Sequence, residues 1–176
     1  MKNNIKIEKA IPNDIWGIFA VQKISWLATY VNEEYGITRE DIMSKDTSSP
    51  ERYKRWRKTL LENKNNNIWI IKENGEIIAF CTAEKKRKRN KIGAIYVLPD
   101  YQGQGFGTTL FLTALKWLGD KKEIFLDVVA YNTRAKLFYQ KFNFQEIGET
   151  PSKELSKLPS GKTMPEIRMA KFPNKN

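Results

Sequence analysis

The chain has 176 residues, of which 40% are hydrophobic, so we expect a single domain over residues 1–176. It has one cysteine, Cys81, and no histidine, which excludes an internal disulfide, a Cys/His metal site and a histidine-based catalytic triad. The net charge of +11 favours anionic partners, and six positive charges lie within residues 85–91.

The N-terminal part is predicted to form a short strand and a long helix. Residues 5–8 alternate in polarity, and Pro12, Asn13 and Asp14 mark a helix start. The C-terminal end of this helix carries an aromatic and acidic cluster, which suits either core packing or a pocket for a cationic group. The residues of this cluster that we assign to substrate binding are Trp26, Tyr30, Glu33 and Tyr35.

Two further helical segments follow. Residues 38–43 favour a helical turn, and the sequence Ser-Ser-Pro-Glu at 48–51 has the cap residues and early proline that open a helix. The apolar stripe of the second helix is Tyr53, Trp56 and Leu60. We expect its basic residues to form a solvated surface, with an anion-binding patch as the alternative; these are Arg52, Lys54, Arg55, Arg57 and Lys58.

A β-hairpin is predicted next, from strands at 68–72 and 77–85 joined by Asn74 and Gly75. The basic run 85–91 then leads to another strand, and its length suits an exposed hairpin tip. A nucleic-acid-binding role for this run is the alternative, although it lacks the interleaved aromatic residues that such surfaces use.

The central stretch reads as strand, turn and helix N-terminus. Residues 92–98 form a β-branched and aromatic run, and three alternate glycines, Gly103, Gly105 and Gly107, lead into an amphipathic helix. Glycines without Cβ atoms allow main-chain N–H groups to turn inward beside the helix N-terminus, an arrangement that suits a phosphate or pyrophosphate. The glycines alone fit a plain turn equally well, and the flanking strand and helix favour the phosphate interpretation.

The C-terminal part continues the alternation of strands and helices. An apolar strand at 124–130 is interrupted by Asp127, and Asn132 with Thr133 can cap a further helix. The inner face of that helix is Ala135, Phe138, Tyr139 and Phe142. Two late strands are expected at 144–148 and 164–172. The alternation predicts an α/β protein with one central sheet covered on both faces.

Two stretches, 95–107 and 128–144, resemble the GCN5-related N-acetyltransferase (GNAT) superfamily. Its cofactor motif has Gln or Arg, two residues, Gly, one residue, and Gly or Ala, which Gln102, Gly105 and Gly107 match. Its later motif is matched by Asn132, Ala135, Phe138, Tyr139 and Lys141, with Asn143 in place of the usual glycine. Element order resembles the superfamily over nearly the whole chain.

The resemblance implies a single mixed sheet of about six to seven strands with helices on both faces, split between the two strands that flank an acetyl-CoA site. Main-chain groups of the first strand pair with the pantetheine arm there, and the glycine loop holds the pyrophosphate. The implied cofactor contacts are Ile95, Tyr96, Val97, Gln102, Gly103, Gln104, Gly105, Phe106, Gly107, Thr108 and Asn132. For Asn132, a helix cap is an equally good interpretation.

The implied reaction is direct attack of a neutral amine on the thioester, with a backbone donor for the oxyanion and an acid for the thiolate. The resemblance assigns the acid to Tyr139, although a tyrosine on an apolar helix face can simply be packed. Many relatives carry an acidic residue early on the strand before the glycine loop, where this chain has Lys-Ile-Gly-Ala at 91–94. Glu84 and then Asp127 are the substitute bases, but an amine of low pKa needs none.

The sequence therefore predicts an acetyl-CoA-dependent N-acetyltransferase acting on a primary amine. The acceptor is a small cationic molecule such as a polyamine or amino sugar, or a peptide. The alternatives are a non-catalytic acetyl-CoA-binding sensor and a nucleic-acid-binding module that uses residues 85–91. No apolar run could span a bilayer and no signal peptide is evident, so we expect a cytoplasmic protein without membrane or metal. Nucleic acid is not the favoured partner, and a homodimer is left open.

Overall fold

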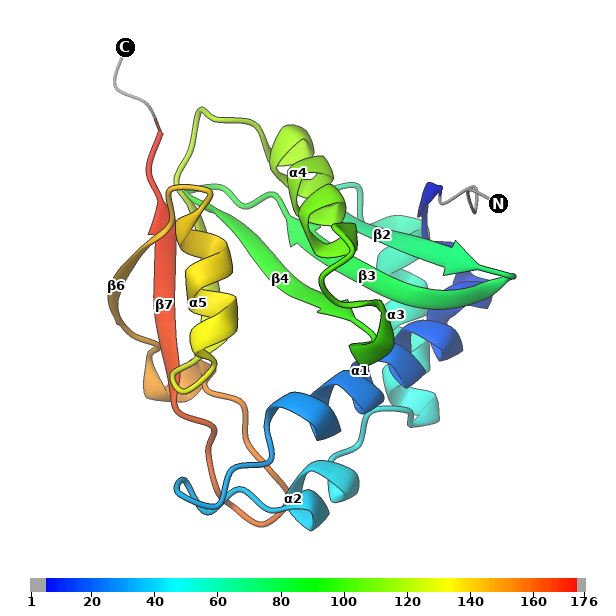
Figure 1. Cartoon of the computed structure of the whole chain (residues 1–176). Helices are drawn as coiled ribbons and strands as arrows, with labels where there is room; N and C mark the ends of the chain where they lie inside the picture. Colours follow the sequence, from blue (N-terminus) through cyan, green and yellow to red (C-terminus); the bar gives the residue numbers. More distant parts are fainter. Residues whose placement is uncertain (1–5, 174–176) are drawn as a thin grey trace.

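The computed structural model describes residues 6–173, and its strands form one mixed sheet. The strands are β1 (Ile7–Lys9), β2 (Asn66–Glu73), β3 (Glu76–Glu84), β4 (Asn90–Val97), β5 (Ile124–Val129), β6 (Gln145–Glu149) and β7 (Glu166–Lys171). Their order is β1-β2-β3-β4-β5-β7-β6, and β4 with β5 is the parallel pair (Figure 1). The predicted mixed sheet is confirmed, while Ile5, placed in the first predicted strand, lies outside the described residues.

Helices cover both faces of the sheet, as predicted. They are α1 (Ile15–Thr29), α2 (Arg39–Ser44), α3 (Pro50–Glu62), α4 (Phe106–Leu118) and α5 (Thr133–Gln140), with 3-10 turns at Pro12–Asp14, Pro99–Tyr101 and Ser152–Glu154. Side chains that alternate along β2 divide between the faces: Ile71 packs with α4, and Ile70 packs with α1. Figure 1 shows α4 and α5 on one side of the sheet and α1 and α3 on the other.

Several turns have the backbone conformation that their residues favour. Asn74 and Gly75 have φ values of 51° and 86°, which suits the predicted hairpin between β2 and β3. The Ser49 side chain accepts a hydrogen bond from Arg52 N and caps α3, and Pro50 occupies its first turn. Asn143 has φ 64°, so it adopts the left-handed conformation that explains a glycine at this position in relatives.

Arg52 differs from the solvated surface residue that we predicted. Its guanidinium lies 4.0 Å from the centroid of the Phe19 ring and 5.5 Å from that of Trp56. It also donates to the Thr47 carbonyl and the Gln22 side chain. The planar guanidinium can stack on rings while its N–H groups find acceptors, which a count of charges on a helix does not reveal. The other basic residues of α3 named above are exposed.

The sheet splits between β4 and β5. These strands pair only at Asn90 with Ile124 and at Lys91 with Phe125, whereas β4 pairs with β3 over nearly its whole length. The β3–β4 register shifts at Gly93, where a Cβ atom would lie 2.6 Å from Thr82 Oγ1. Gly93 is therefore a bulge residue that bends β4, and Figure 1 shows β4 running away from β7 and α5.

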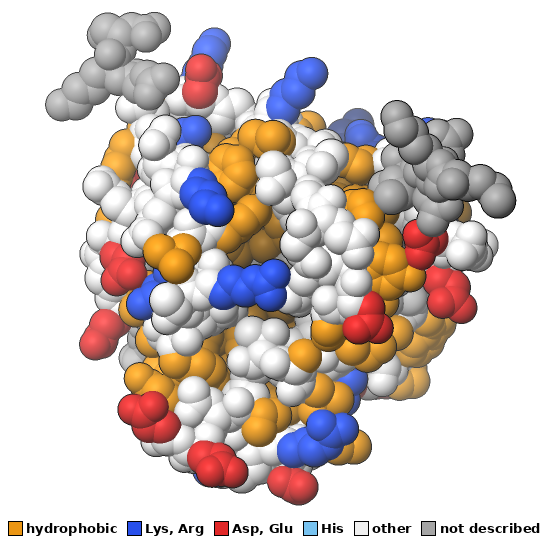
Figure 2. Space-filling view, viewed as in Figure 1, with side chains coloured by type: hydrophobic (Ala, Val, Ile, Leu, Met, Phe, Trp, Pro, Cys, Tyr) orange, Lys and Arg blue, Asp and Glu red, His pale blue; other side chains and the backbone are white. Residues whose placement is uncertain are grey.

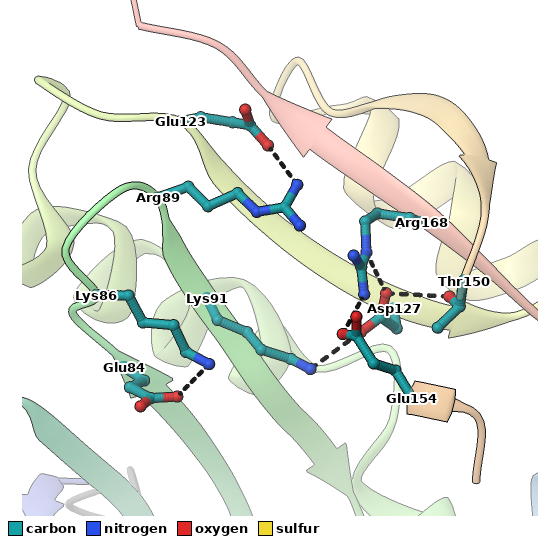
Figure 3. Close-up of polar contacts among 9 residues, drawn as sticks. All are labelled: Glu84, Lys86, Arg89, Lys91, Glu123, Asp127, Thr150, Glu154 and Arg168. Atoms are coloured by element: carbon teal, nitrogen blue, oxygen red, sulfur yellow. Dashed lines mark hydrogen bonds and ion pairs between the residues drawn. The ribbon is translucent and has the colours of Figure 1, made fainter. Parts of the chain in front are cut away.

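A buried charge network lies where the two strands begin to separate (Figure 3). Asp127 on β5 accepts hydrogen bonds from Lys91 Nζ at 3.0 Å, Arg168 Nε at 2.7 Å and Thr150 Oγ1 at 3.0 Å. Arg168 on β7 also contacts Glu154 at 2.8 Å. Burial by itself raises the pKa of Asp127, but Arg168 and Lys91 outweigh this effect and hold the pKa below its ordinary value. The network links β4, β5 and β7 at the base of the split.

We expect Asp127→Asn to lower the free energy of unfolding by about 3 kcal/mol near neutral pH, because it leaves Lys91 and Arg168 without their buried counter-charge. The ionised Asp127 contributes stability above its unfolded pKa of about 3.9 and loses it as pH falls through the lower folded pKa. The difference in unfolding free energy between Asp127→Asn and wild type should therefore become smaller at acid pH. Urea unfolding at a series of pH values measures this difference. Glu84→Gln, which removes only the exposed pair with Lys86, is the control and should cost less than about 1 kcal/mol; equal losses in both variants would contradict the structural role of Asp127.

Candidate active site

The opening between β4 and β5 exposes main-chain groups of β4. Leu98 N donates to Ile78 O, so the preceding pair, Val97 and Ala79, is a non-hydrogen-bonded pair. The N–H and C=O groups of Val97, and of Ile95 two residues earlier, thus point away from β3 into the opening. Beyond Lys91, no strand in the described part of the chain pairs with this side of β4. Figure 2 shows a hollow with apolar side chains at its base between the two halves of the molecule.

The glycine loop forms one end of the opening. Gly103 and Gly105 have φ values of 82° and 87°, and no atom lies within 4 Å of a Cβ built on either residue. Gly105 is the N-cap of α4, and the first bond of this helix runs from Thr109 N to Gly105 O. The N–H groups of Phe106, Gly107 and Thr108 therefore have no partner within the helix and are available to an anion. This loop fits a pyrophosphate.

Three residues that we predicted in the loop belong to the helix. Phe106, Gly107 and Thr108 are the first residues of α4, and the Phe106 side chain is buried against Tyr101. Only the main chain of Phe106 and Gly107 can therefore face a ligand at the helix N-terminus. Gln104 is exposed and donates to the Asp100 carbonyl, so it braces the loop.

Gln102 closes part of the opening. Its amide nitrogen donates to Val97 O at 3.0 Å, and its amide oxygen accepts from Arg134 at the start of α5. Asn132, the N-cap of α5, accepts from Ala135 N at 3.1 Å, which is the helix-cap role considered above. Gln102 thus joins the glycine loop to α5 across the split.

Tyr139 lies on the buried face of α5 beside the opening. Its ring packs against Phe111, Phe138 and Phe144, and the residue is 8% exposed. No hydrogen bond to its hydroxyl occurs among the described residues. Burial, followed by the proximity of Tyr96 and Cys81, raises the pKa of Tyr139 far above its ordinary value. The hydroxyl therefore stays protonated and has a proton to donate.

The aromatic cluster of α1 meets β4 on the other face of the sheet. Trp26 Nε1 donates to Tyr96 Oη at 2.7 Å, and the hydroxyls of Tyr30 and Tyr96 are 3.2 Å apart. The Tyr35 ring packs against that of Tyr131, with ring centroids 4.7 Å apart and the ring planes tilted by 36°. Burial raises the pKa values of Tyr30 and Tyr96, so both hydroxyls remain neutral. Trp26 and Tyr30 thus lie together, and Tyr35 is connected to them through Tyr131. Tyr35 and Glu33 are both exposed to solvent.

The geometry argues against both substitute bases. Glu84 pairs with Lys91 across β3 and β4, four residues before Ile95, which corresponds to about 13 Å along the strand. Its carboxylate contacts Lys86. Asp127 is closer, but its carboxylate is occupied by Lys91, Arg168 and Thr150 (Figure 3).

Sequence reasoning missed three residues at the site: Tyr131, Arg134 and Glu166. The first two lie within the Asn132 motif, so their position next to it was a usable signal. Glu166 opens β7 opposite Val129, and its charge is close enough to raise the pKa values of Tyr30 and Tyr96. Burial raises the pKa of Glu166 itself. No local pattern marks Glu166, because its position depends on strand pairing.

Residues 6–173 contain neither a candidate metal site nor a membrane-spanning helix. No group of three or more Cys, Asp or Glu side chains there is arranged to hold a metal ion. Within the same range, no helix is both long and apolar enough to cross a membrane. Cys81 is fully buried, and burial raises its pKa, so its thiol is unreactive.

The family model described as Acetyltransferase (GNAT) family matches residues 25–144. A Bacillus subtilis protein provisionally named ribosomal protein bS18-alanine N-acetyltransferase is 31% identical over 91 residues. That match covers 51% of this chain and only 60% of the relative.

Solved structures share the fold. The PaiA N-acetyltransferase of Thermoplasma acidophilum, in complex with coenzyme A, is 22% identical with a TM-score of 0.74, covering 96% of this chain and 99% of that one. The ribosomal-protein-S18-alanine N-acetyltransferase of Escherichia coli is 18% identical with a TM-score of 0.67, covering 98% and 96%. The chain belongs to the acetyltransferase (GNAT) family, and this membership confirms the predicted family and the predicted class of acetyltransferase.

Proposed function

We propose that this chain transfers the acetyl group of acetyl-CoA to the N-terminal α-amine of a protein or peptide by direct attack in a ternary complex. The observation that carries the proposal is the opening beyond Lys91, where the main-chain groups of Ile95 and the N–H of Val97 have no strand partner and face the side of Tyr139. The acetyltransferase relatives support it at the level of reaction class.

The donor half of the reaction uses main-chain groups. When bound, acetyl-CoA supplies a thioester carbonyl and a thiolate leaving group. The N–H groups of Phe106, Gly107 and Thr108 hold its pyrophosphate, aided by the positive end of α4. The inward-facing N–H groups of Ile95 and Val97 are the donors for the oxyanion that develops on the carbonyl.

Tyr139 is the proposed general acid. Its neutral hydroxyl lacks a protein partner in the described chain, so it can donate a proton to the departing thiolate. The apolar rings that pack around it fix its position. A sensor that only binds the cofactor would have no use for such a hydroxyl, which favours catalysis over the non-catalytic alternative.

The acceptor is inferred from the missing base. An α-amine has a pKa of about 7.7–8.0, so a large fraction is neutral at physiological pH, whereas an alkyl amine such as lysine has a pKa of about 10.4. With Glu84 distant and Asp127 occupied, an acceptor that needs no strong base fits best. The Bacillus subtilis relative, whose name specifies the alanine of a ribosomal protein, is consistent with this choice.

A small cationic amine is the second candidate. The site has a partly buried carboxyl, Glu166, near the tyrosines Tyr30 and Tyr96, and such a group can bind an ammonium ion beside aromatic faces. A carboxyl of raised pKa could also accept the proton that the amine releases. Both acceptors use the same donor half, so only turnover distinguishes them.

An acceptor screen tests the proposal by thiol release from acetyl-CoA. We expect peptides with a free N-terminal alanine to have a higher kcat/KM than three other acceptors. These are the same peptides with a blocked N-terminus, blocked peptides that offer only a lysine side chain, and spermidine. The rate should rise with pH and level off near about 8, following the α-amine. A higher kcat/KM for spermidine would shift the assignment to the second candidate. If the protein binds acetyl-CoA but releases no CoA with any amine, the non-catalytic sensor becomes the assigned function.

Tyr139→Phe should lower kcat by about 100-fold or more, because the thiolate loses its proton donor. Coenzyme A affinity, measured by calorimetry, should remain within about twofold, since the ring and its packing are retained. Tyr53→Phe, which alters a tyrosine stacked on Trp16 away from the opening, is the matched control and should keep full activity. Unchanged kcat in Tyr139→Phe at every pH would remove the tyrosine from the mechanism.

Gly105→Ala should weaken coenzyme A binding at least tenfold. Alanine at φ 87° costs roughly 1–2 kcal/mol and displaces the main chain that faces the pyrophosphate. Gly75→Ala is a matched control, because Gly75 has φ 86° and an equally empty surrounding, but lies in the β2–β3 turn. Both variants should lose similar stability in thermal unfolding, and only Gly105→Ala should lose affinity. Equal affinities would contradict the phosphate role of the loop.

A further inference from the structure

We infer that the end of the molecule opposite the glycine loop binds single-stranded nucleic acid. This end, called the basic end below, consists of residues 84–89, residues 116–123, Lys171 and Phe172. It has nine cations, namely Lys85, Lys86, Arg87, Lys88, Arg89, Lys116, Lys121, Lys122 and Lys171, against three acids, namely Glu84, Asp120 and Glu123. A surplus of six charges, out of a net +11, therefore lies here. Figure 2 shows Lys and Arg along the upper edge of the molecule.

Tertiary contacts assemble this surface from segments that are separate in the sequence. Lys122 Nζ donates to Lys86 O at 3.1 Å, and Arg89 pairs with Glu123 at 3.4 Å. Asn90 holds both segments, because its side chain donates to Leu118 O and accepts from Lys86 N. The basic loop between β3 and β4 is thus fixed against the α4–β5 loop. Binding of a ligand there therefore costs little conformational entropy of the main chain.

Seven of the nine cations of the basic end have no carboxylate within ion-pair distance among the described residues, because only Lys86 and Arg89 form ion pairs there. Four of the seven are exposed and make no side-chain hydrogen bond or cation–π contact among those residues, namely Arg87, Lys88, Lys116 and Lys121. A cluster of unpaired like charges is unfavourable unless solvent or a polyanion compensates it, and phosphates release counterions when such cations bind them. The charge distribution therefore favours a partner with a repeating negative charge.

A hollow of about 340 Å³ distinguishes this surface from a simple charged loop. Lys116, Lys122, Lys171 and Phe172 line it together with the end of α4, and Phe172 is 47% exposed. The C-terminal end of α4 faces the hollow with carbonyl groups that carry partial negative charge. They disfavour a phosphate inside the hollow but can accept hydrogen bonds from the amino group of a base. An unpaired base stacked on Phe172, with its flanking phosphates on the lysines, matches this arrangement, whereas a duplex keeps its bases stacked inside.

The basic end is separate from the acetyltransferase site. It lies at the C-terminal end of α4, and the 13 residues of this helix place it about 20 Å from the glycine loop. Aromatic residues absent from the 85–91 run are supplied by the fold: Lys85 lies 4.5 Å from the Trp117 ring centroid, and Phe172 follows β7. This inference replaces our sequence-based preference against a nucleic-acid partner.

Fluorescence anisotropy with labelled oligouridylate and oligothymidylate of about 15 nucleotides tests the inference on the full chain. The variant replaces Arg87, Lys88, Lys116 and Lys121 by alanine, and the control replaces four exposed cations of α3, Lys54, Arg55, Arg57 and Lys58. Each lowers the net charge by four. We expect the first variant to bind at least tenfold more weakly, with a salt slope reduced by up to about 3. The control should stay within about twofold of wild type.

Phe172→Ala separates stacking from charge. It should weaken single-stranded binding several-fold while leaving the weaker binding of a duplex unchanged. Equal binding of the two oligonucleotides, or a preference for either, supports the inference, and a preference for uridylate indicates contact with the 2′-hydroxyl. Absent binding at physiological salt, equal losses in both charge variants, or binding to anionic lipid vesicles alone would overturn it. Circular dichroism and unchanged kcat of the variants verify that the fold persists.

Discussion

The incomplete pairing of β4 with β5 is the constraint on which the rest of this structure depends. Two pairs of residues join the strands, and the Gly93 bulge then directs β4 away. Main-chain N–H and C=O groups that would otherwise form sheet hydrogen bonds are left facing an opening. Unsatisfied backbone groups are costly when buried, so such an edge persists only where water or a ligand can reach it. A strand edge of this kind can take the extended arm of a cofactor.

The split requires a firm base, and buried charges provide it. Asp127, Lys91 and Arg168 join three strands at the point of divergence. Such a network is favourable only when each member is paired, so it specifies the register of β4, β5 and β7 around the opening. A residue that holds the sheet in this way is poorly suited to proton abstraction, because its lone pairs are already engaged. The same physical property that makes Asp127 structural thus removes a general base from the site.

Burial keeps hydroxyl groups protonated on both faces of the opening, but the surroundings of these groups differ. Around Tyr139, burial among apolar rings raises the pKa of the hydroxyl and keeps it protonated beside the opening. On the α1 face, Trp26, Tyr30 and Tyr96 form a hydrogen-bonded group of neutral donors and acceptors near Glu166. The excess positive charge lies mainly at the basic end, away from this acceptor side. The net charge of +11 therefore describes one end of the molecule better than it describes the active site.

Local sequence determined the elements of this protein, because their signals are short in range. Alternate glycines before an amphipathic helix, the Asn-Gly turn and the Asn132 cap each act within a few residues. The glycine motif and the Asn132 motif predicted the family, which is confirmed, and a loop suited to a pyrophosphate. Contacts between distant segments were decided by the tertiary structure alone. Strand pairing brought Arg168 and Lys91 to Asp127, placed Glu166 near Tyr96, and set the 121–122 lysines beside the 85–89 loop. These outcomes depend on register and on buried electrostatics, which no local pattern encodes.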